Sequence, residues 1–177
     1  MTHPALERLF CPRSVAVIGA SPTPGKAGHA LMRSLTCFGG PVYPIHPTAR
    51  EVLGRPIAGR ISELPEVPDL ALLAVPARAV PGLVRECGDA GVAGAVVHAG
   101  AFAEIGDEGD ELQPELAIAA ADTGIRLLGP NTSGFLAPHL RLCASFVEPA
   151  ATVSPGPLTI VAHSGGVNHA LAFGAHG

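Results

Sequence analysis

Apolar residues occur along this chain in short runs, separated by stretches in which apolar positions recur three or four residues apart. A short, nearly continuous apolar run is typical of a strand buried on both faces, and the wider spacing is typical of a helix. The runs are Ser14–Ala20, Pro41–Pro47, Asp69–Val75, Gly94–Gly100 and Ile125–Gly129. Strands that alternate with helices in this way indicate βαβ units. We therefore predict an α/β fold, a Rossmann-like doubly wound parallel sheet, over residues 1–150.

Prolines cannot donate to a β-ladder, so the run Pro41–Pro47 is expected to form a strand at an edge of the sheet.

Three helices are predicted between the apolar runs. Their apolar positions are Ala27, Ala30, Leu31, Leu35 and Phe38 in the first, Val80, Leu83, Val84 and Cys87 in the second, and Leu112, Leu116 and Ala119 in the third, which covers roughly residues 108–122.

The last part of the chain begins a new unit after Pro149–Pro157, a linker rich in proline and small residues. Its pattern predicts a strand over Leu158–Ala162, a tight turn, and a helix that begins near Val167. One strand and part of a helix bury too little surface to form a core. We expect residues 151–177 to be a linker and the truncated start of a second, flavodoxin-like α/β domain, or a piece that docks on a partner.

Composition narrows the class of protein. The chain has 177 residues, of which 47% are hydrophobic and 15% charged, and its formal net charge is −4. These values are typical of a globular protein, and a nucleic-acid surface would need a basic stripe that the sequence lacks. No run approaches the roughly 18 apolar residues of a membrane span, and the N-terminus does not have the pattern of a signal peptide. We expect a cytoplasmic protein without nucleic-acid or membrane partners.

Residue types that carry metal or acyl-transfer chemistry are present without the required spacing. The four cysteines are far apart and form no CxxC pair, so no zinc site is predicted. His163, His169 and His176 lack the i, i+4 spacing and carboxylate of a metal-binding helix. Ser164 follows a predicted strand like a nucleophile elbow, but Ala162 stands where that motif has its first glycine. We predict no metal and no catalytic residue. Two interpretations of Ser164 stay open: a helix N-cap, or part of a turn whose backbone N–H groups face a phosphate.

The stretch VIGASPTPGKAG, from Val17 to Gly28, joins the first strand to the first helix through a glycine-rich loop with one lysine. In an open α/β sheet this turn is the usual anion site, because free backbone N–H groups and the helix dipole point there. A Walker A loop is excluded, because five residues rather than four separate Gly19 from Gly25. Ala27 also stands where that motif needs a magnesium-binding hydroxyl.

The same loop departs from the dinucleotide fingerprint G-x-G-x-x-G. Ser21 occupies the position of the second glycine, and the loop is longer than the fingerprint allows. NAD sites usually have a carboxylate at the end of the second strand to bind the adenosine ribose. This chain has His46 and Arg50 there and no carboxylate before Glu51. A carboxylate would repel a phosphate on that ribose and these two side chains would attract one, which leaves NADP and coenzyme A as ligands.

Six segments of the chain, in order, carry a resemblance to a known family. They are Leu9–Gly28, Val42–Pro56, Asp69–Pro81, Gly91–Gly109, Gly124–Phe135 and Gly156–Val167. Together they resemble the CoA-binding domain of NDP-forming acyl-CoA synthetases. That family includes ADP-forming acetyl-CoA synthetase and the α subunit of succinyl-CoA synthetase.

The resemblance implies that coenzyme A lies across the carboxyl ends of the strands. Its adenosine diphosphate portion would lie at the glycine loop, its adenosine end at the second strand, and its pantetheine arm along the later strands. The implied contacts are Gly19, Ala20, Ser21, Thr23, Gly25 and Lys26 in the loop, His46, Pro47 and Arg50 at the adenosine, Val75 and Pro76 against the ligand, and His98, Ala99, Gly100 and Asn131 along the pantetheine.

The sequence departs from the family pattern at several of these positions. The family commonly has Asn-Pro-Lys at the end of the second strand, where this chain has His46-Pro47-Thr48, so Arg50 is the candidate replacement for that lysine. The fourth strand usually ends in Ser-Ala-Gly-Phe, where this chain has His98-Ala99-Gly100-Ala101. The Gly-Pro-Asn loop usually continues with cysteine, where this chain has Thr132.

The function that the resemblance implies is coenzyme A binding within an enzyme that converts an acid, ATP and coenzyme A into acyl-CoA, ADP and phosphate. The family's phosphorylated histidine and ATP-grasp region have no counterpart in these 177 residues, so the chain alone is not expected to run the whole reaction. It would act with another ligase domain or subunit, or as a homo-oligomer. Two alternatives stay open, a stand-alone CoA- or nucleotide-binding regulatory or scaffold module and an NADP-linked reductase.

Overall fold

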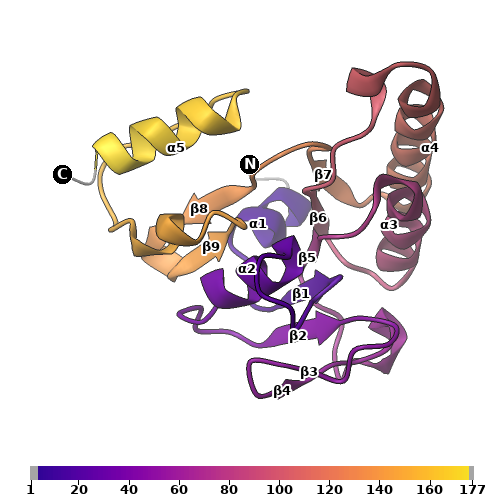
Figure 1. Ribbon diagram of the computed structural model, residues 1–177, viewed down its shortest axis with the longest axis horizontal. Coiled ribbons are helices and arrows are strands. Elements are labelled where there is room, and N and C mark those ends of the chain that lie inside the picture. Colours follow the sequence, from indigo (N-terminus) through magenta and orange to yellow (C-terminus); the bar gives the residue numbers. More distant parts are fainter. Residues whose placement is uncertain (1–3, 176–177) are drawn as a thin grey trace.

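The computed structural model describes residues 4–175 and has a five-stranded sheet at its centre (Figure 1). The strand order is β2-β1-β5-β6-β7, and all neighbouring strands of this sheet pair in parallel. The strands are β1 (Val15–Ile18), β2 (Val42–Ile45), β5 (Leu70–Leu73), β6 (Gly94–Val97) and β7 (Arg126–Leu128). Each lies within one of the predicted apolar runs, so the predicted α/β, Rossmann-like doubly wound sheet is confirmed.

In the described part of the chain, five α-helices and five short 3₁₀ helices precede, connect or follow these strands. Across residues 4–175, no helix combines the length and apolar character needed to cross a membrane. The α-helices are α1 (Pro4–Phe10), α2 (Ala27–Ser34), α3 (Val80–Asp89), α4 (Asp107–Thr123) and α5 (Gly165–Gly174). The 3₁₀ helices are η1 (Ile61–Glu63), η2 (Ala77–Ala79), η3 (Ala103–Ile105), η4 (Pro138–Leu140) and η5 (Glu148–Thr152).

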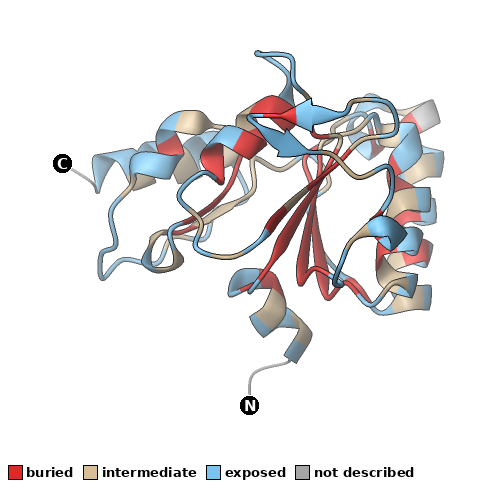
Figure 2. Ribbon diagram, turned by 90° about the horizontal axis from the view of Figure 1, so that it is seen from below, coloured by how far each residue is buried: buried red, intermediate tan, exposed pale blue. Residues whose placement is uncertain are grey.

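Helices cover both faces of the sheet, because successive side chains of a buried strand point to opposite faces. Val17 of β1 packs with Leu31 of α2 in one core, which also includes α1. The next residue, Ile18, packs in a second core with Val84 of α3 and with α4. Strands β1, β2, β5 and β6 are largely buried between these two layers, β7 at the far edge is partly exposed, and the outer helix surfaces are exposed (Figure 2).

Strand β2 lies at the edge of the sheet, as its prolines predict. Its outer side is partly covered, because Ala58 forms a parallel bridge with Ile45. The Ala58 N–H donates to the carbonyl of Pro44 at 3.0 Å, and the Ala58 carbonyl accepts from the N–H of His46 at 3.0 Å. The segment that follows Ala58 therefore runs alongside the end of β2.

Two antiparallel hairpins lie outside the predicted elements. One consists of β3 (Glu51–Val52) and β4 (Arg55–Pro56), and the other of β8 (Phe135–Ala137) and β9 (Leu142–Ala144). Strands of two or three residues are too short to carry a periodic signal. The second hairpin extends the core on the α2 face, where Leu142 is buried.

The C-terminal segment contains the predicted helix but not the predicted strand. The strand expected over Leu158–Ala162 is wrong, because these residues pair with no strand and Val161 is 93% exposed. A strand needs a neighbour to satisfy its backbone groups, and the segment has none beside it. Helix α5 follows Ser164, whose Oγ accepts the N–H of Val167 at 3.4 Å, so the N-cap interpretation is confirmed. The domain boundary near residue 150 remains a prediction.

Asp69 joins four parts of the structure at the amino end of β5. Its carboxylate is buried and accepts the Arg8 Nε–H at 2.6 Å, the Arg13 N–H at 2.9 Å and the Arg13 Nε–H at 3.0 Å. Its carbonyl accepts the N–H of Ala93 and of Gly94, at the start of β6. Burial alone would raise the pKa of Asp69, but the hydrogen bonds from Arg13 and Arg8 outweigh it and hold the pKa at about 2.

Replacing Asp69 with asparagine should lower the free energy of unfolding at pH 7 by about 2 kcal/mol, because a charge-assisted network is lost. The native pKa lies below the ordinary value of 3.8, so this stabilisation is present above that pH and is lost as the pH falls towards 2. Urea unfolding from pH 7 to pH 2 measures the difference. Asp122→Asn, which breaks an exposed pair with Arg85, is the control and should cost less than about 1 kcal/mol. A difference between wild type and Asp69→Asn that stays constant with pH would contradict this account.

Candidate functional site

A cavity of about 800 Å³ lies at the carboxyl ends of β1, β2, β5 and β6. Helix α2 follows β1 on one face of the sheet and α3 follows β5 on the other, so the connections diverge between these two neighbouring strands. In an open α/β sheet, ligands bind outside the carboxyl ends of the strands at such a switch point. The position of the cavity makes it the candidate functional site.

Most of the residues expected to bind a ligand are brought together on the wall of this cavity. Those that line it are Gly19, Ser21, Lys26, His46, Pro47, Val75, Pro76, His98 and Ala99. Those that do not are Ala20, Thr23, Gly25, Arg50, Gly100 and Asn131. The second group is close in sequence to the first.

The first strand-to-helix connection is held together by close backbone approach. A Cβ at Gly28, in the first turn of α2, would overlap the carbonyl oxygen of Gly19. A Cβ at Gly19, whose φ is +90°, would overlap the carbonyl oxygen of Ala74 at the end of β5. Glycine at these two positions therefore lets α2 begin directly against the ends of two strands.

Ser21 organises the loop between Gly19 and α2. Its Oγ accepts the N–H of Thr23 at 3.1 Å, and its carbonyl oxygen contacts Nδ1 of His29 at 3.1 Å. Ala20 is fully buried and donates its N–H to the carbonyl of Ile45 at 3.1 Å, which explains its absence from the wall. Thr23 and Gly25 lie on the exposed outer part of the loop. The loop thus presents Gly19, Ser21 and Lys26 to the cavity.

The amino end of α2 is open to an anionic ligand. Lys26 is the residue before the helix, its backbone is extended, and no side chain caps this end of the helix. The first N–H groups of a helix have no acceptor within it, and the helix dipole places partial positive charge there. With the ammonium group of Lys26 beside them, these N–H groups have the chemistry of a phosphate site.

His46, at the end of β2, contributes a hydrogen-bond donor. Its Nδ1 accepts the N–H of Ala49 at 3.0 Å and of Thr48 at 3.2 Å, so we infer that the ring proton is on Nε2. Arg50 directly follows this turn and precedes the β3–β4 hairpin; it is exposed, and its carbonyl accepts the N–H of Ile57 at 2.9 Å. Arg50, the cation expected to contact the ligand near the end of β2, therefore does not line the cavity.

His98, at the end of β6, is buried among uncharged groups. Its Nδ1 contacts the carbonyl oxygen of Thr132 at 3.0 Å and therefore carries the proton. Its Nε2 is buried without a hydrogen-bond partner among the described residues. Burial lowers the pKa of His98 to about 4, although the hydrogen bond to Thr132 opposes this shift. The ring is thus neutral at pH 7, and Phe146 meets it edge to face with the ring centroids 5.4 Å apart.

Gly100 and Asn131 lie together beside the cavity rather than on its wall. The N–H of Asn131 donates to the carbonyl of Ala99 at 2.8 Å. A Cβ at Gly100 would lie 3.2 Å from Oδ1 of Asn131. The Gly-Pro-Asn loop is therefore attached to the end of β6, as the resemblance implies, and their role as ligand contacts remains a prediction.

Several residues on the wall were not among the expected contacts. Some of them adjoin the expected contacts in the sequence. Those that do not include Arg60 before η1, Leu83 and Glu86 of α3, and Phe146 after β9. The helical pattern places Leu83 on the inner face of α3, but nothing in the sequence links that face to a ligand. Arg60 and Phe146 each follow a hairpin that the periodicity does not reveal, so their positions depend on tertiary structure alone.

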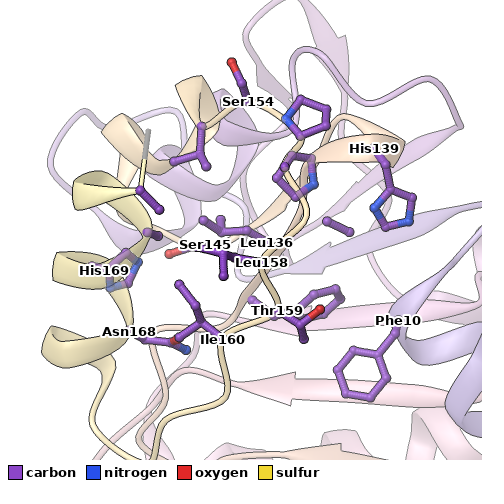
Figure 3. A pocket seen from close by; sticks show the side chains of 18 of the residues that line it. Phe10, Leu136, His139, Ser145, Ser154, Leu158, Thr159, Ile160, Asn168 and His169 are labelled. Atoms are coloured by element: carbon purple, nitrogen blue, oxygen red, sulfur yellow. The ribbon is translucent and has the colours of Figure 1, made fainter. Parts of the chain in front are cut away.

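A second cavity, of about 700 Å³, lies between α1, the β8–β9 hairpin and the C-terminal segment (Figure 3). Phe10, Leu136, Leu158 and Ile160 contribute apolar side chains to it, and His169 faces it from α5. None of the expected ligand contacts lines it, and its described lining includes no lysine or arginine. Among the described residues, Lys26 and Arg60 line the first cavity and not this one.

The part of the chain that the structure describes contains no cluster of side chains that could bind a metal ion. Among the side chains that the structure describes, which exclude those of residues 107 and 108, no three His, Cys, Asp or Glu gather closely enough to hold a metal ion. His176, one of the three histidines considered above, lies outside the described residues.

A family model described as a CoA binding domain matches residues 13–138 of this chain. This range contains the whole parallel sheet and every expected ligand contact. The match therefore covers the parallel sheet and the residues that line the cavity, apart from Phe146.

Curated relatives are similar over nearly the whole chain. The ADP-forming acetate–CoA ligase I of Archaeoglobus fulgidus is 42% identical over 160 residues, which are 90% of this chain and 23% of that ligase. The α subunit of the ADP-forming acetate–CoA ligase I of Pyrococcus furiosus is 39% identical over an alignment of 176 positions, which covers 94% of this chain and 37% of that subunit. The chain thus spans well under half the length of these relatives.

A solved structure confirms the fold. It is that of the Ca. Korarchaeum cryptofilum dinucleotide forming acetyl-coenzyme A synthetase 1, in complex with phosphate and ADP. Its TM-score is 0.81 at 38% sequence identity, and the match covers 97% of this chain and 36% of that one.

The burial of His98 predicts a specific pH dependence of stability. The pKa is about 4 in the folded state and 6.5 for an ordinary histidine, so the unfolded chain binds more protons between these values. The stabilisation from a neutral His98 is complete above pH 6.5 and is lost as the pH falls towards 4, by on the order of 3 kcal/mol.

Urea unfolding of wild type and His98→Asn at pH 7, 5.5 and 4 tests this prediction. Asparagine can still donate to Thr132 but does not titrate, so wild type should lose stability relative to the variant as the pH falls. Parallel pH curves for the two proteins, or a His98 ring that titrates near pH 6.5 by NMR, would show that burial does not control this group.

Proposed function

Because this chain belongs to the CoA binding domain family, we propose that it binds coenzyme A in the cavity at the ends of β1, β2, β5 and β6. The observation that carries the proposal is the cradle formed by Gly19, Lys26 and Gly28. In this cradle, Lys26 and the start of α2, whose first N–H groups have no acceptor within the helix, line the same cavity, while the N–H of Gly19 donates to the carbonyl of Ile45 at 2.9 Å. This donor set suits the diphosphate of coenzyme A.

The rest of the cavity suits the uncharged parts of the same ligand. Val75 and Pro76 at the end of β5 offer an apolar surface, and His98 and Ala99 continue it along β6. His98 is neutral at pH 7, and its unpartnered Nε2 is an acceptor. The cavity thus has a polar region at the glycine loop and a mainly apolar wall along the ends of β5 and β6. A ligand with a charged end and a long, weakly polar arm fits such a cavity better than a ligand charged throughout.

We further propose that the chain is the CoA-binding part of an NDP-forming acyl-CoA synthetase, which converts an acid, ATP and coenzyme A into acyl-CoA, ADP and phosphate. Coenzyme A supplies the thiol that receives the acyl group. The contribution of this chain is to hold the ligand, exclude water from its arm and fix the direction of that arm, which is catalysis by positioning. No acid or base of this chain is assigned to the reaction.

A partner supplies the remaining steps in this proposal. One similar relative is itself named as an α subunit, and the matched relatives are more than twice as long as the matched segment. We propose that another ligase domain or subunit carries the nucleotide and the acyl group. Mixing the chain with candidate partner chains, ATP, an acid and coenzyme A would separate a ligase part from a stand-alone binding module.

Titration calorimetry should record coenzyme A binding at micromolar concentration and no heat from NADPH or NADP⁺ at the same concentrations. The reason is that the glycine loop is too long for the dinucleotide fingerprint, while its N–H groups and Lys26 still hold a diphosphate. NADPH binding without coenzyme A binding would overturn both the ligase proposal and the binding-module alternative in favour of the reductase.

Lys26→Ala should weaken coenzyme A binding about tenfold, because one charge-assisted contact to the diphosphate is removed while the backbone donors remain. The control is Arg55→Ala, which removes an exposed cation on β4, away from the cavity, and should leave the affinity unchanged. Unchanged affinity in Lys26→Ala would show that the backbone alone carries the anion.

A further inference from the structure

Arg60 is a cation on the cavity wall that the sequence pattern does not predict. Among the described residues that line the cavity, the lysine and arginine side chains are Lys26 and Arg60. Arg50, which the sequence favours as the second cation, does not line it. The wall therefore has two cations, and they come from different parts of the fold.

The backbone places Arg60 beside the end of β2. Ala58 is paired in parallel with Ile45, and its carbonyl accepts the N–H of His46 at 3.0 Å. Continuing this parallel register brings the next two residues of the segment, Gly59 and Arg60, alongside His46 and Pro47. The position of Arg60 thus follows from main-chain hydrogen bonds rather than from the choice of one side-chain rotamer.

Lys26 and Arg60 belong to opposite sides of the sheet. Lys26 precedes α2, which packs on one face, whereas Ile61, next to Arg60, packs in the core on the other face. The two cations are therefore suited to two separate anionic groups of one ligand rather than to a shared group.

Glu63 fixes Arg60 without occupying its whole guanidinium group. Oε2 of Glu63 accepts the N–H of Gly59 at 2.7 Å, and its Oε1 lies 3.3 Å from Nε of Arg60. In the described part of the chain, the hydrogen bonds and ion pairs of Arg60 are with Glu63, and its side chain is 70% exposed. A guanidinium has five N–H donors, so its terminal nitrogens are available for a bidentate contact with a phosphate.

The other polar side chains on the wall are less suited than Arg60 to a bidentate contact with a phosphate. His46 has its Nδ1 engaged by backbone N–H groups and offers one N–H donor. Glu86 also lines the cavity and carries the opposite charge. Arg60 is therefore the side chain best suited to bind a second phosphate of the ligand at the β2 end of the cavity.

We propose that Arg60 binds the phosphate on the adenosine ribose of coenzyme A and is the residue that distinguishes coenzyme A from dephospho-coenzyme A. The inference rests on the proposed function, because it assumes that the diphosphate lies at the glycine loop and the adenosine at the end of β2. It assigns the charged subsite at the adenosine end to the segment after the β3–β4 hairpin.

The test is a calorimetric titration of the full chain with coenzyme A and with dephospho-coenzyme A. Wild type should bind coenzyme A about tenfold more tightly than dephospho-coenzyme A, as one charge-assisted phosphate contact implies. Arg60→Gln should lower the affinity for coenzyme A about tenfold and change that for dephospho-coenzyme A less than about twofold. The two ligands should then bind the variant almost equally.

Two further variants locate the effect. Lys26→Gln should weaken both ligands by the same factor, because both carry the diphosphate. Arg55→Gln, an exposed change on β4, is the matched control and should alter neither affinity. Thermal unfolding of Arg60→Gln should match wild type, because the side chain is exposed.

The outcomes that overturn the inference differ from those that overturn the proposed function. A wild type that binds both ligands equally, or an Arg60→Gln variant that keeps the preference for coenzyme A or loses both ligands alike, refutes the role of Arg60 while coenzyme A binding stands. Loss of the preference in Arg50→Gln instead would assign the role to Arg50. A wild type that binds neither ligand refutes the proposed function, and the inference with it.

Discussion

The structure depends on the direct contact between the first turn of α2 and the ends of β1 and β5. A side chain at Gly28 would overlap the carbonyl of Gly19, and one at Gly19 would overlap the carbonyl of Ala74. Because these backbones meet without side chains between them, the N–H groups at the start of α2 reach the switch point of the sheet. The same contact packs α2 on its face of the sheet, so the fold and the candidate site share one steric requirement.

From this contact the cavity extends in two directions that differ in charge. Towards β2 it meets His46 and Arg60, and towards β6 it meets Val75, Ala99 and the neutral His98. At the opposite end of the strands, Asp69 ties α1, β1, β5 and β6 together through buried hydrogen bonds. The chain thus separates a polar network that supports the sheet from a cavity whose polar groups remain available to a ligand. Similarity to ADP-forming acetate–CoA ligases is consistent with this arrangement.

The sequence predicts the parallel sheet and most of the cavity, because both depend on local patterns. Buried strands of four apolar residues and the glycine loop are read directly from the chain, and the ends of parallel strands must meet at one edge. The strand expected over residues 158–162 does not form, since an apolar run becomes a strand only beside a partner. Arg60 is missed because its position follows from the pairing of Ala58 with Ile45, which has no periodic signal.

The central claim is that a ligand with a diphosphate binds at the Gly19–Gly28 connection, and NMR can test it on the intact chain. ¹⁵N-labelled protein titrated with coenzyme A should show the largest amide shifts at Gly19, Ser21 and Ala27, with smaller shifts near His46 and His98. Shifts confined to the second cavity, around Leu136 and His169, or no shifts at saturating coenzyme A, would contradict the account.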